Sequence, residues 1–238
     1  METQTELEQY QAEMTKKRRI QQQALAVLTR AKEAGIPPDM MRIPEAKFLE
    51  LLDLGFMADQ QDMNKKQVAE FCHELFSSPN RLMKIPFILI DGGDFYARSR
   101  AGFSILFRMI AWDNNAKYVY YARLAHQLQS WDTGDVPRNV LTEDYKNYDT
   151  LFIAEYTPVL AKASLDTGGF LDDIFAARDF SCSPTIFSFQ QIIPAKNVES
   201  INRCSDSTQG QYVSMFTKVD EDKNSTFSKT KVLRIRVK

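Results

Sequence analysis

The sequence predicts an α/β protein with a parallel central sheet, preceded by a small N-terminal helical domain. Residues 2–34 contain neither glycine nor proline and are rich in Glu, Gln, Ala, Leu and Lys, a composition that favours helix. From residue 87 onward, short apolar runs alternate with helical stretches, which is typical of a parallel sheet buried on both faces. The glycine and prolines of Ala34–Phe48 separate the two patterns.

The N-terminal part is expected to be helical throughout. Apolar residues recur there at spacings of three and four and form one narrow stripe: Leu7, Tyr10, Met14, Ile20, Ala24, Val27, Leu28 and Ala31. The run Lys16-Lys17-Arg18-Arg19 interrupts this stripe and is either a solvated face or a contact with phosphate or a partner. Gly35 suits a C-terminal cap. We assign residues 1–55 to a partner-binding helical region and residues 56–238 to the α/β domain.

The remaining elements follow from the same patterns. Helices are expected over Glu45–Leu54 and Lys65–Phe76, the second with Val68, Phe71, Cys72 and Leu75 inward. The expected strands are Phe87–Ile90, Tyr118–Tyr121, Thr150–Ala154, Thr185–Phe189, Val213–Thr217 and Lys231–Val237. The helices between them are expected over Ala97–Trp112, Ala122–Trp131 and Gly169–Asp179. The last strand alternates apolar and basic residues, so we expect it at a sheet edge.

Composition excludes several classes of protein. A net charge of -1 over 238 residues gives no overall attraction to nucleic acid, so any such contact must come from local patches. Cys72, Cys182 and Cys204 are too few and too widely spaced for a disulfide framework, and we expect buried thiols in a reducing cytoplasm. With only two histidines, neither a structural zinc site nor a histidine-based catalytic triad is expected. No signal peptide or membrane span is indicated.

Residues Gly92–Ser99 resemble a phosphate-binding loop with some key residues changed. The nucleotide-binding pattern G-x-x-x-x-G-K-[ST] aligns with G-G-D-F-Y-A-R-S, between an expected strand and an expected helix. In such a loop, backbone N–H groups and a helix N-terminus bind phosphate oxygens. Gly92 and Ser99 fit the pattern, whereas Ala97 replaces the second glycine and Arg98 replaces the lysine. Gly92-Gly93 therefore predicts either a phosphate site or a plain tight turn.

Two later segments match the other motifs of such NTPases, in the expected order. The apolar run Leu151–Ile153 is followed by Ala154-Glu155, where related enzymes carry Asp-Glu for Mg²⁺ and the attacking water. The segment "CSPTIFSFQQ" resembles the strand whose polar end senses the γ-phosphate in many AAA+ enzymes, with Gln190 near that place. Three degenerate motifs in the right order are more specific than one.

Together these segments resemble the bacterial replicative helicase loaders of the DnaC/DnaI type, which are AAA+ proteins related to the IstB transposition ATPases. The resemblance extends to "RAKEAGIPPDMMRIPEAKF" before the α/β domain, to "AKYVYYARLAHQLQS", and to "FLDDIFAARDFSCSPTIFSFQQ". It covers roughly residues 25–205. It implies an AAA+-like P-loop core behind an N-terminal helical domain.

The resemblance also implies a set of site residues. Nucleotide-binding roles fall on Gly92, Gly93, Ala97, Arg98, Ser99 and Gln190, catalytic roles fall on Glu155 and Arg203, and no metal ligand is assigned. Arg98 carries a larger, planar cation than lysine, the Cβ of Ala97 crowds the phosphate path, and Ala154 lacks a carboxylate for Mg²⁺. We therefore expect ATP hydrolysis to be weak or lost, with either no cofactor or ATP/ADP with Mg²⁺.

The partners are implied in the same way. The family resemblance implies a DNA replication factor that binds a hexameric replicative helicase through its N-terminal helices and single-stranded DNA through its α/β body. Assembly into a homo-oligomer on the helicase ring is a further expectation, and no membrane partner is expected. A protein supplied in excess, for example by a phage, could dispense with ATP turnover. The alternatives are an active AAA+ ATPase of the loader or transposition-regulator type, and an α/β module that binds some other protein.

Several residues keep an alternative without a functional role. Arg98 and Arg100 are either surface charges or phosphate contacts, and Glu155 is either a retained catalytic residue or an ordinary polar strand end. The tyrosines 118, 120 and 121 are expected to pack on the sheet, with stacking on bases as the alternative. The basic tail either lines a DNA backbone or protects an edge strand from aggregation: Lys229, Lys231, Arg234, Arg236 and Lys238.

Overall fold

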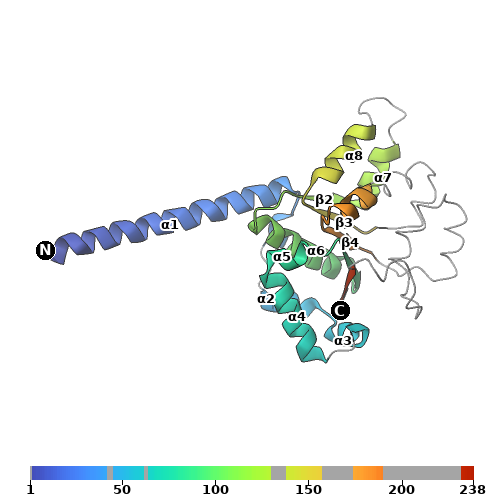
Figure 1. Cartoon of the computed structure of the whole chain (residues 1–238), viewed down its shortest axis with the longest axis horizontal. Coiled ribbons are helices and arrows are strands. Elements are labelled where there is room, and N and C mark those ends of the chain that lie inside the picture. The colour runs from blue at the N-terminus through green and yellow to red at the C-terminus, as the bar shows by residue number, and fades with distance from the viewer. Residues whose placement is uncertain (1, 42–44, 62–63, 130–137, 157–173, 190–231) are drawn as a thin grey trace, which may run out of the picture.

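The chain folds into an α/β body from which one long helix projects (Figure 1). The computed structural model describes residues 2–41, 45–61, 64–129, 138–156, 174–189 and 232–238. Helix α1 (Glu2–Glu33) is 32 residues long, as the composition predicts. Gly35 (φ 90°) lies two residues after its end, where the N–H of Ile36 donates to the carbonyl of Ala31 and that of Gly35 to the carbonyl of Lys32, each at 3.0 Å. This pair of hydrogen bonds forms a glycine C-cap, so that prediction is confirmed.

The sheet within the described residues has five parallel strands in the order β2-β3-β4-β1-β5. The strands are β1 (Phe87–Gly92), β2 (Ala116–Tyr120), β3 (Thr150–Ala154), β4 (Thr185–Ser188) and β5 (Val232–Val237). The predicted α/β class with a parallel sheet is therefore confirmed, and β5 lies at one edge of this order as predicted. The expected strand Val213–Thr217 lies outside the described residues.

Strands β1, β3 and β4 bury side chains on both faces of the sheet, which explains their continuous apolar runs, whereas β5 buries alternate residues. Along β1, Ile88 and Ile90 join one apolar cluster, whereas Phe87 and Leu89 join the other. Helix α6 (Phe95–Ala111) contributes to the first cluster. Helices α7 (Tyr121–Gln129) and α8 (Arg138–Asn147) contribute to the second, and Figure 1 shows them on the opposite side of the sheet from α2–α6.

Short helices connect α1 to the sheet. They are η1 (Pro38–Met40), α2 (Glu45–Leu51), α3 (Leu54–Gln61), α4 (Lys65–Ser77) and α5 (Pro79–Leu82). The helix expected over Glu45–Leu54 is α2, which ends at Leu51, and Leu54 begins α3. The expected third helix is confirmed, and Asn64 begins it with a capping box to Gln67. Phe48 and Leu52 lie in the same apolar cluster as Ile90, so α2 packs with the sheet. The division of the chain at residue 55 stays a prediction.

Several element boundaries differ from expectation by a few residues. Strand β2 ends at Tyr120, and Tyr121 begins α7. Helix α6 begins at Phe95, because Asp94 caps it earlier than the apolar pattern indicates. Of the helix expected over Gly169–Asp179, residues 174–180 are described and are helical. Across the described ranges, no helix is both long and apolar enough to span a bilayer.

Candidate functional site

Four strands of the sheet bring polar residues together at their carboxyl ends. Gly92 ends β1, Glu155 follows β3, Ser188 ends β4, and Arg236 lies near the end of β5. The carboxyl edge of a parallel sheet is where such folds bind ligands. The structure thus places the Gly92–Ser99 turn and Glu155 at one site, as the motif comparison requires.

The side chain of Arg98 occupies the inside of this turn. It is buried, with 3% of its surface exposed, although it lies on the first turns of α6. Its Nε and Nη2 donate to the two carboxylate oxygens of Glu155 at 2.9 and 2.8 Å. Its Nη1 donates to the carbonyl oxygens of Gly92 and Gly93 at 3.0 and 2.8 Å. The guanidinium therefore sits between the turn and Glu155, in a bidentate geometry that lysine cannot make.

Glu155 is held from its other side by Ser188. The Ser188 hydroxyl donates to Glu155 Oε1 at 3.1 Å and accepts from the Glu155 N–H at 2.9 Å. The backbone of Glu155 has a φ of 54°, a left-handed conformation that costs a non-glycine residue about 1–2 kcal/mol. We attribute the persistence of this conformation to the bonds from Arg98 and Ser188, which hold the carboxylate in one position.

The N-terminus of α6 already has an anionic partner. Asp94 is its N-cap, and its Oδ1 accepts from the N–H of Ala97 at 2.7 Å. Only Gly93 and Asp94 lie between β1 and α6, so Phe95 and Tyr96 belong to the helix. A phosphate-binding loop needs several free N–H groups ahead of the helix. Here the connection is a tight turn, and a carboxylate of the chain itself lies at the helix N-terminus.

The C-terminal strand closes the other side of the turn. A Cβ added at Gly92 (φ 79°) would lie 2.5 Å from the carbonyl oxygen of Val237, and one added at Gly93 (φ 48°) would lie 2.4 Å from that of Lys238. Both contacts are closer than real Cβ atoms make, so the two glycines permit a close approach of β5. Residues that the motif assigns to phosphate binding thus pack against the carboxyl end of the chain.

A buried carboxylate ties β5 to β1 beside the turn. Asp91 is 1% exposed and lies directly opposite Arg236 in the parallel register. Arg236 Nε lies 3.2 Å from Asp91 Oδ1, and Arg234 Nε lies 3.4 Å from Asp91 Oδ2. Burial lowers the pKa of Arg234, and the charge of Asp91 opposes that shift. These ion pairs fix β5 in the place where it covers Gly92.

Taken together, the residues of this turn do not fit a bound triphosphate in the arrangement that the structure describes. The helix N-terminus bonds Asp94, the turn carbonyls bond Arg98, and the glycines contact β5. Glu155 is committed to an ion pair that is 2.8 Å long. This arrangement is best suited to a structural role, because the bidentate Arg98–Glu155 pair joins β1, α6 and β3.

At this site the structure contradicts one sequence hypothesis and leaves others as predictions. Arg98 is a buried ion-pair partner, so its interpretation as a surface charge is wrong. Arg100 is half-buried, and its guanidinium lies 5.5 Å from the ring centroid of Tyr96. Gln190 and Arg203 lie outside the described residues. The catalytic role of Glu155 and the nucleotide-binding role of Ser99, which is buried, stay predictions.

Sequence reasoning missed three residues of the site: Asp91, Asp94 and Ser188. Asp94 carried a usable signal, because Asp is a preferred N-cap directly before the first helical residue, here Phe95. Ser188 carried none, since its hydroxyl acts only through the neighbouring strand. Asp91 could be found only by knowing that β5 lies beside β1.

Other predicted residues are also corrected or confirmed. Tyr118 packs against Phe103 and Phe152, with ring centroids 4.7 and 5.5 Å apart, so its core role is confirmed. Tyr120 is 41% exposed, which contradicts its expected packing. Cys72 is buried, and burial raises the pKa of its thiol to about 11. Cys182 is exposed at a turn with φ 53°, so its expected burial is wrong, and Cys204 lies outside the described residues.

In the described part of the basic tail, Arg234 and Arg236 pair with Asp91, so DNA contact and edge protection by these side chains both stay predictions. The outer side of β5 bonds the segment between α2 and α3: the N–H of Lys238 donates to the carbonyl of Leu51 at 2.9 Å, and the N–H of Asp53 to that of Arg236 at 2.7 Å. Because these bonds cover the edge strand, it offers a smaller template for pairing with another chain. Lys229 and Lys231 lie outside the described residues.

Comparison with known proteins adds a set of similar folds. No model of a known protein family matches the chain, and no curated protein sequence matches it. Among solved structures, the chain is similar to DnaI (13% identity, 85% of this chain and 92% of DnaI, TM-score 0.48). It is similar to the DnaC helicase loader (11% identity, 72% and 89%, TM-score 0.46). It is also similar to AMPPCP-bound DnaA from Aquifex aeolicus (15% identity, 71% and 46%, TM-score 0.49).

The matched part of the chain spans less than half of the DnaA structure. Helicase loaders, the class that the sequence motifs resemble, are among these similar folds. Similarity at this level concerns the fold alone. The chemistry of this chain therefore has to be argued from its own residues.

Proposed function

We propose that this protein is a DNA replication factor of the helicase-loader kind that acts by binding, with no ATP turnover at the Gly92–Ser99 turn. Its partners are a hexameric replicative helicase, bound through α1, and single-stranded DNA, bound through the α/β body. The sequence resemblance supports the choice of partners, and the cytoplasmic location that it implies is part of the proposal.

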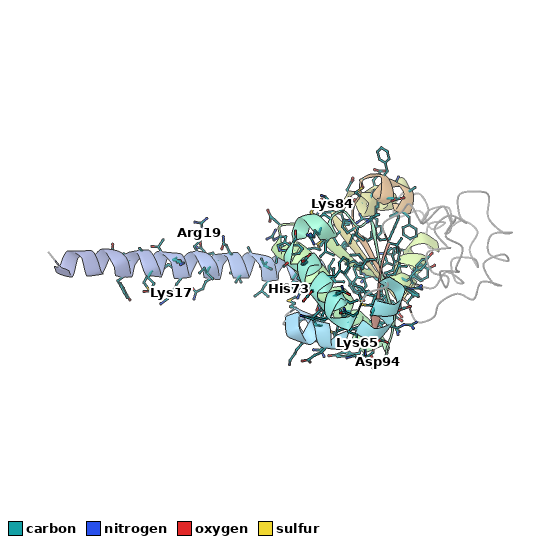
Figure 2. All side chains as sticks on the ribbon, turned by 60° about the horizontal axis from the view of Figure 1, so that its bottom comes forward. Lys17, Arg19, Lys65, His73, Lys84 and Asp94 are labelled. Atoms are coloured by element: carbon teal, nitrogen blue, oxygen red, sulfur yellow. The ribbon has the colours of Figure 1, made fainter. Side chains whose placement is uncertain are left out.

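The observation that carries the proposal is the projecting helix α1. Figure 2 shows Lys17 and Arg19 on a part of this helix that lies away from the body. Tyr10, Ile20 and Leu25 of α1 are 62, 55 and 66% exposed. A helix in a protein gains most of its stability from packing an apolar face against other elements. A long helix with exposed apolar residues is therefore suited to a partner protein.

The base of α1 is anchored, so that a partner bound to the helix would be coupled to the body. Ala31 is fully buried, and Val27 and Leu28 pack against the same apolar cluster as α6. Arg30 forms an ion pair with Asp113 at the end of α6. The four basic residues from Lys16 to Arg19 are exposed, which supports a solvated or partner-facing role for them.

A pull-down with a purified hexameric replicative helicase tests the proposal. We expect the full chain to associate with the helicase and the variant Tyr10→Gln/Ile20→Gln/Leu25→Gln to lose association by at least roughly tenfold, because interface anchors each contribute about 1–2 kcal/mol or more. Met83→Gln/Phe180→Gln is the matched control, since Met83 and Phe180 are 39 and 95% exposed and lie outside α1. Equal association of both variants would remove α1 from the function.

Titration with Mg²⁺ and ATP tests the second half of the proposal. We expect no saturable binding and no turnover above a blank, because Arg98 and Asp94 occupy the groups that would bind phosphate. Binding with turnover that Glu155→Gln abolishes would instead establish the alternative, an active ATPase of the loader or transposition-regulator type.

A further inference from the structure

A pocket of about 390 Å³ lies along the edge strand β2, away from the Gly92–Ser99 turn. Strand β2 forms its floor, α7 provides Arg123 and Gln127, and α8 with the residues after it provides Asp144 and Tyr148. β2 is the last strand on this side of the described sheet. The volume lies in the range of small-ligand sites.

Aromatic side chains and cations meet in this pocket. Tyr120 and Tyr148 line it, the first 41% exposed and the second half-buried, so their rings are reachable from solvent. Lys117 and Arg123 line it as well, against the single carboxylate of Asp144. Two cations against one anion leave a local charge of +1 in a protein whose net charge is -1.

The wall of the pocket is fixed by a buried arginine. Arg178 is fully buried and donates to the carbonyls of Tyr145 and Tyr148 at 3.0 and 2.6 Å, and to that of Pro184 at 2.8 Å. Its Nε also donates to Thr185 Oγ1 at 2.7 Å. These bonds join the end of α8 to the start of β4. The backbone of Tyr148 therefore has a set position relative to β4, which lowers the entropy cost of ordering this wall on binding.

We propose that this pocket binds one nucleotide unit of single-stranded DNA, with the base against Tyr148 and Tyr120 and the adjoining phosphates near Lys117 and Arg123. Aromatic rings next to a cationic groove are the pattern by which proteins bind single strands, because every base has a face that can stack. Asp144 accepts hydrogen bonds from the amino groups of adenine, cytosine or guanine, which thymine lacks. The choice of DNA as the ligand rests on the proposed function. The inference adds the site at which the DNA binds.

Fluorescence anisotropy with a labelled single-stranded oligonucleotide tests the site. Tyr148→Ala and Tyr120→Ala should each weaken binding roughly 5- to 100-fold, the loss expected when one base loses its stacking partner. Tyr148→Phe keeps the ring and should bind like the unaltered protein. Phe180→Ala is the matched control, because Phe180 is 95% exposed and lies outside the pocket.

The salt dependence of binding tests the cations separately. Lys117→Gln/Arg123→Gln should reduce the slope of log K against log salt by about 0.7 for each DNA phosphate that the protein no longer neutralises. Lys65→Gln/Lys84→Gln is the charge-matched control, since both lysines are exposed on the body, where Figure 2 labels them, and neither lines the pocket. Circular dichroism and thermal unfolding of each variant verify that it is folded.

Two results would overturn the inference while the helicase pull-down still decides the proposed function. One is equal DNA binding by the pocket variants and their controls, or no binding by the unaltered protein. The other is competition by a free deoxynucleoside monophosphate as strong as that of the oligonucleotide at equal nucleotide concentration, which would make the ligand a free nucleotide. Weakened binding in the pocket variants alone, with little competition from the monophosphate, supports the site.

Discussion

The turn at Gly92–Ser99 and the pocket along β2 differ in how their polar groups are used. At the turn, Arg98, Glu155 and Asp94 bond one another or the nearby backbone, and β5 covers the glycines. Along β2, Lys117, Arg123 and Tyr120 line an open volume. The turn carries a recognisable motif, whereas the pocket carries none. The comparison teaches that a motif locates a backbone feature, while the contacts of its side chains decide whether a ligand can bind there.

The largest expected effect comes from breaking the Arg98–Glu155 pair. Glu155→Ala leaves a guanidinium that is 3% exposed without its carboxylate, so we expect the free energy of unfolding to fall by about 3–5 kcal/mol. Urea denaturation monitored by circular dichroism measures this loss. Lys117→Gln at the β2 pocket should change the free energy of unfolding by less than about 0.5 kcal/mol, because no buried partner is left behind.

A double variant shows whether the loss belongs to the pair. Arg98→Met/Glu155→Leu removes both charges and fills a similar volume, so it should recover most of the stability that Glu155→Ala loses. Losses that simply add in the double variant would mean that the two side chains act independently, and the turn would not be closed by their pairing.

A pair of glycines gives the next largest effect. Gly92→Ala places a Cβ at 2.5 Å from a backbone carbonyl at φ 79°, and we expect a loss of roughly 2–5 kcal/mol from strain and overpacking. Gly35→Ala, at φ 90° on the rim of the β2 pocket, meets no atom closer than 3.4 Å, so only the conformational cost of about 1–2 kcal/mol applies. Thermal unfolding of the two variants side by side measures the difference. Equal losses would show that β5 can move away from a Cβ at residue 92 at little energetic cost.

Much of the fold could be predicted from the sequence because its elements carry local signals. The strands Phe87–Gly92 and Thr150–Ala154 are continuous apolar runs, and α1 is a long stretch without helix breakers. The strand order and the contact between β5 and Gly92 could not be predicted, since they depend on pairing between segments far apart in the chain. The motif placed Arg98 near Glu155 correctly, but it could not show that the two side chains bond each other.

A smaller effect is expected at the cap of α6. Asp94→Ala removes the acceptor for the N–H of Ala97 and should lower the free energy of unfolding by about 1 kcal/mol. Asp94→Asn keeps a good N-cap and should lose only a few tenths of a kcal/mol. Denaturant titration of both variants resolves this difference. A similar loss in both would indicate that the charge of Asp94, rather than its hydrogen bond, stabilises the helix N-terminus.

The smallest effect, measured here on ATP binding, is expected from restoring the motif itself. Ala97→Gly/Arg98→Lys rewrites the turn as G-G-D-F-Y-G-K-S, which matches the nucleotide-binding pattern at every fixed position. We expect this variant to remain without saturable ATP binding in a calorimetric titration with Mg²⁺. Asp94 still caps α6, only two residues still separate β1 from α6, and Val237 and Lys238 still lie against the glycines. Micromolar binding by this variant would show that the two side chains alone close the site, and that the turn and β5 rearrange readily around a phosphate.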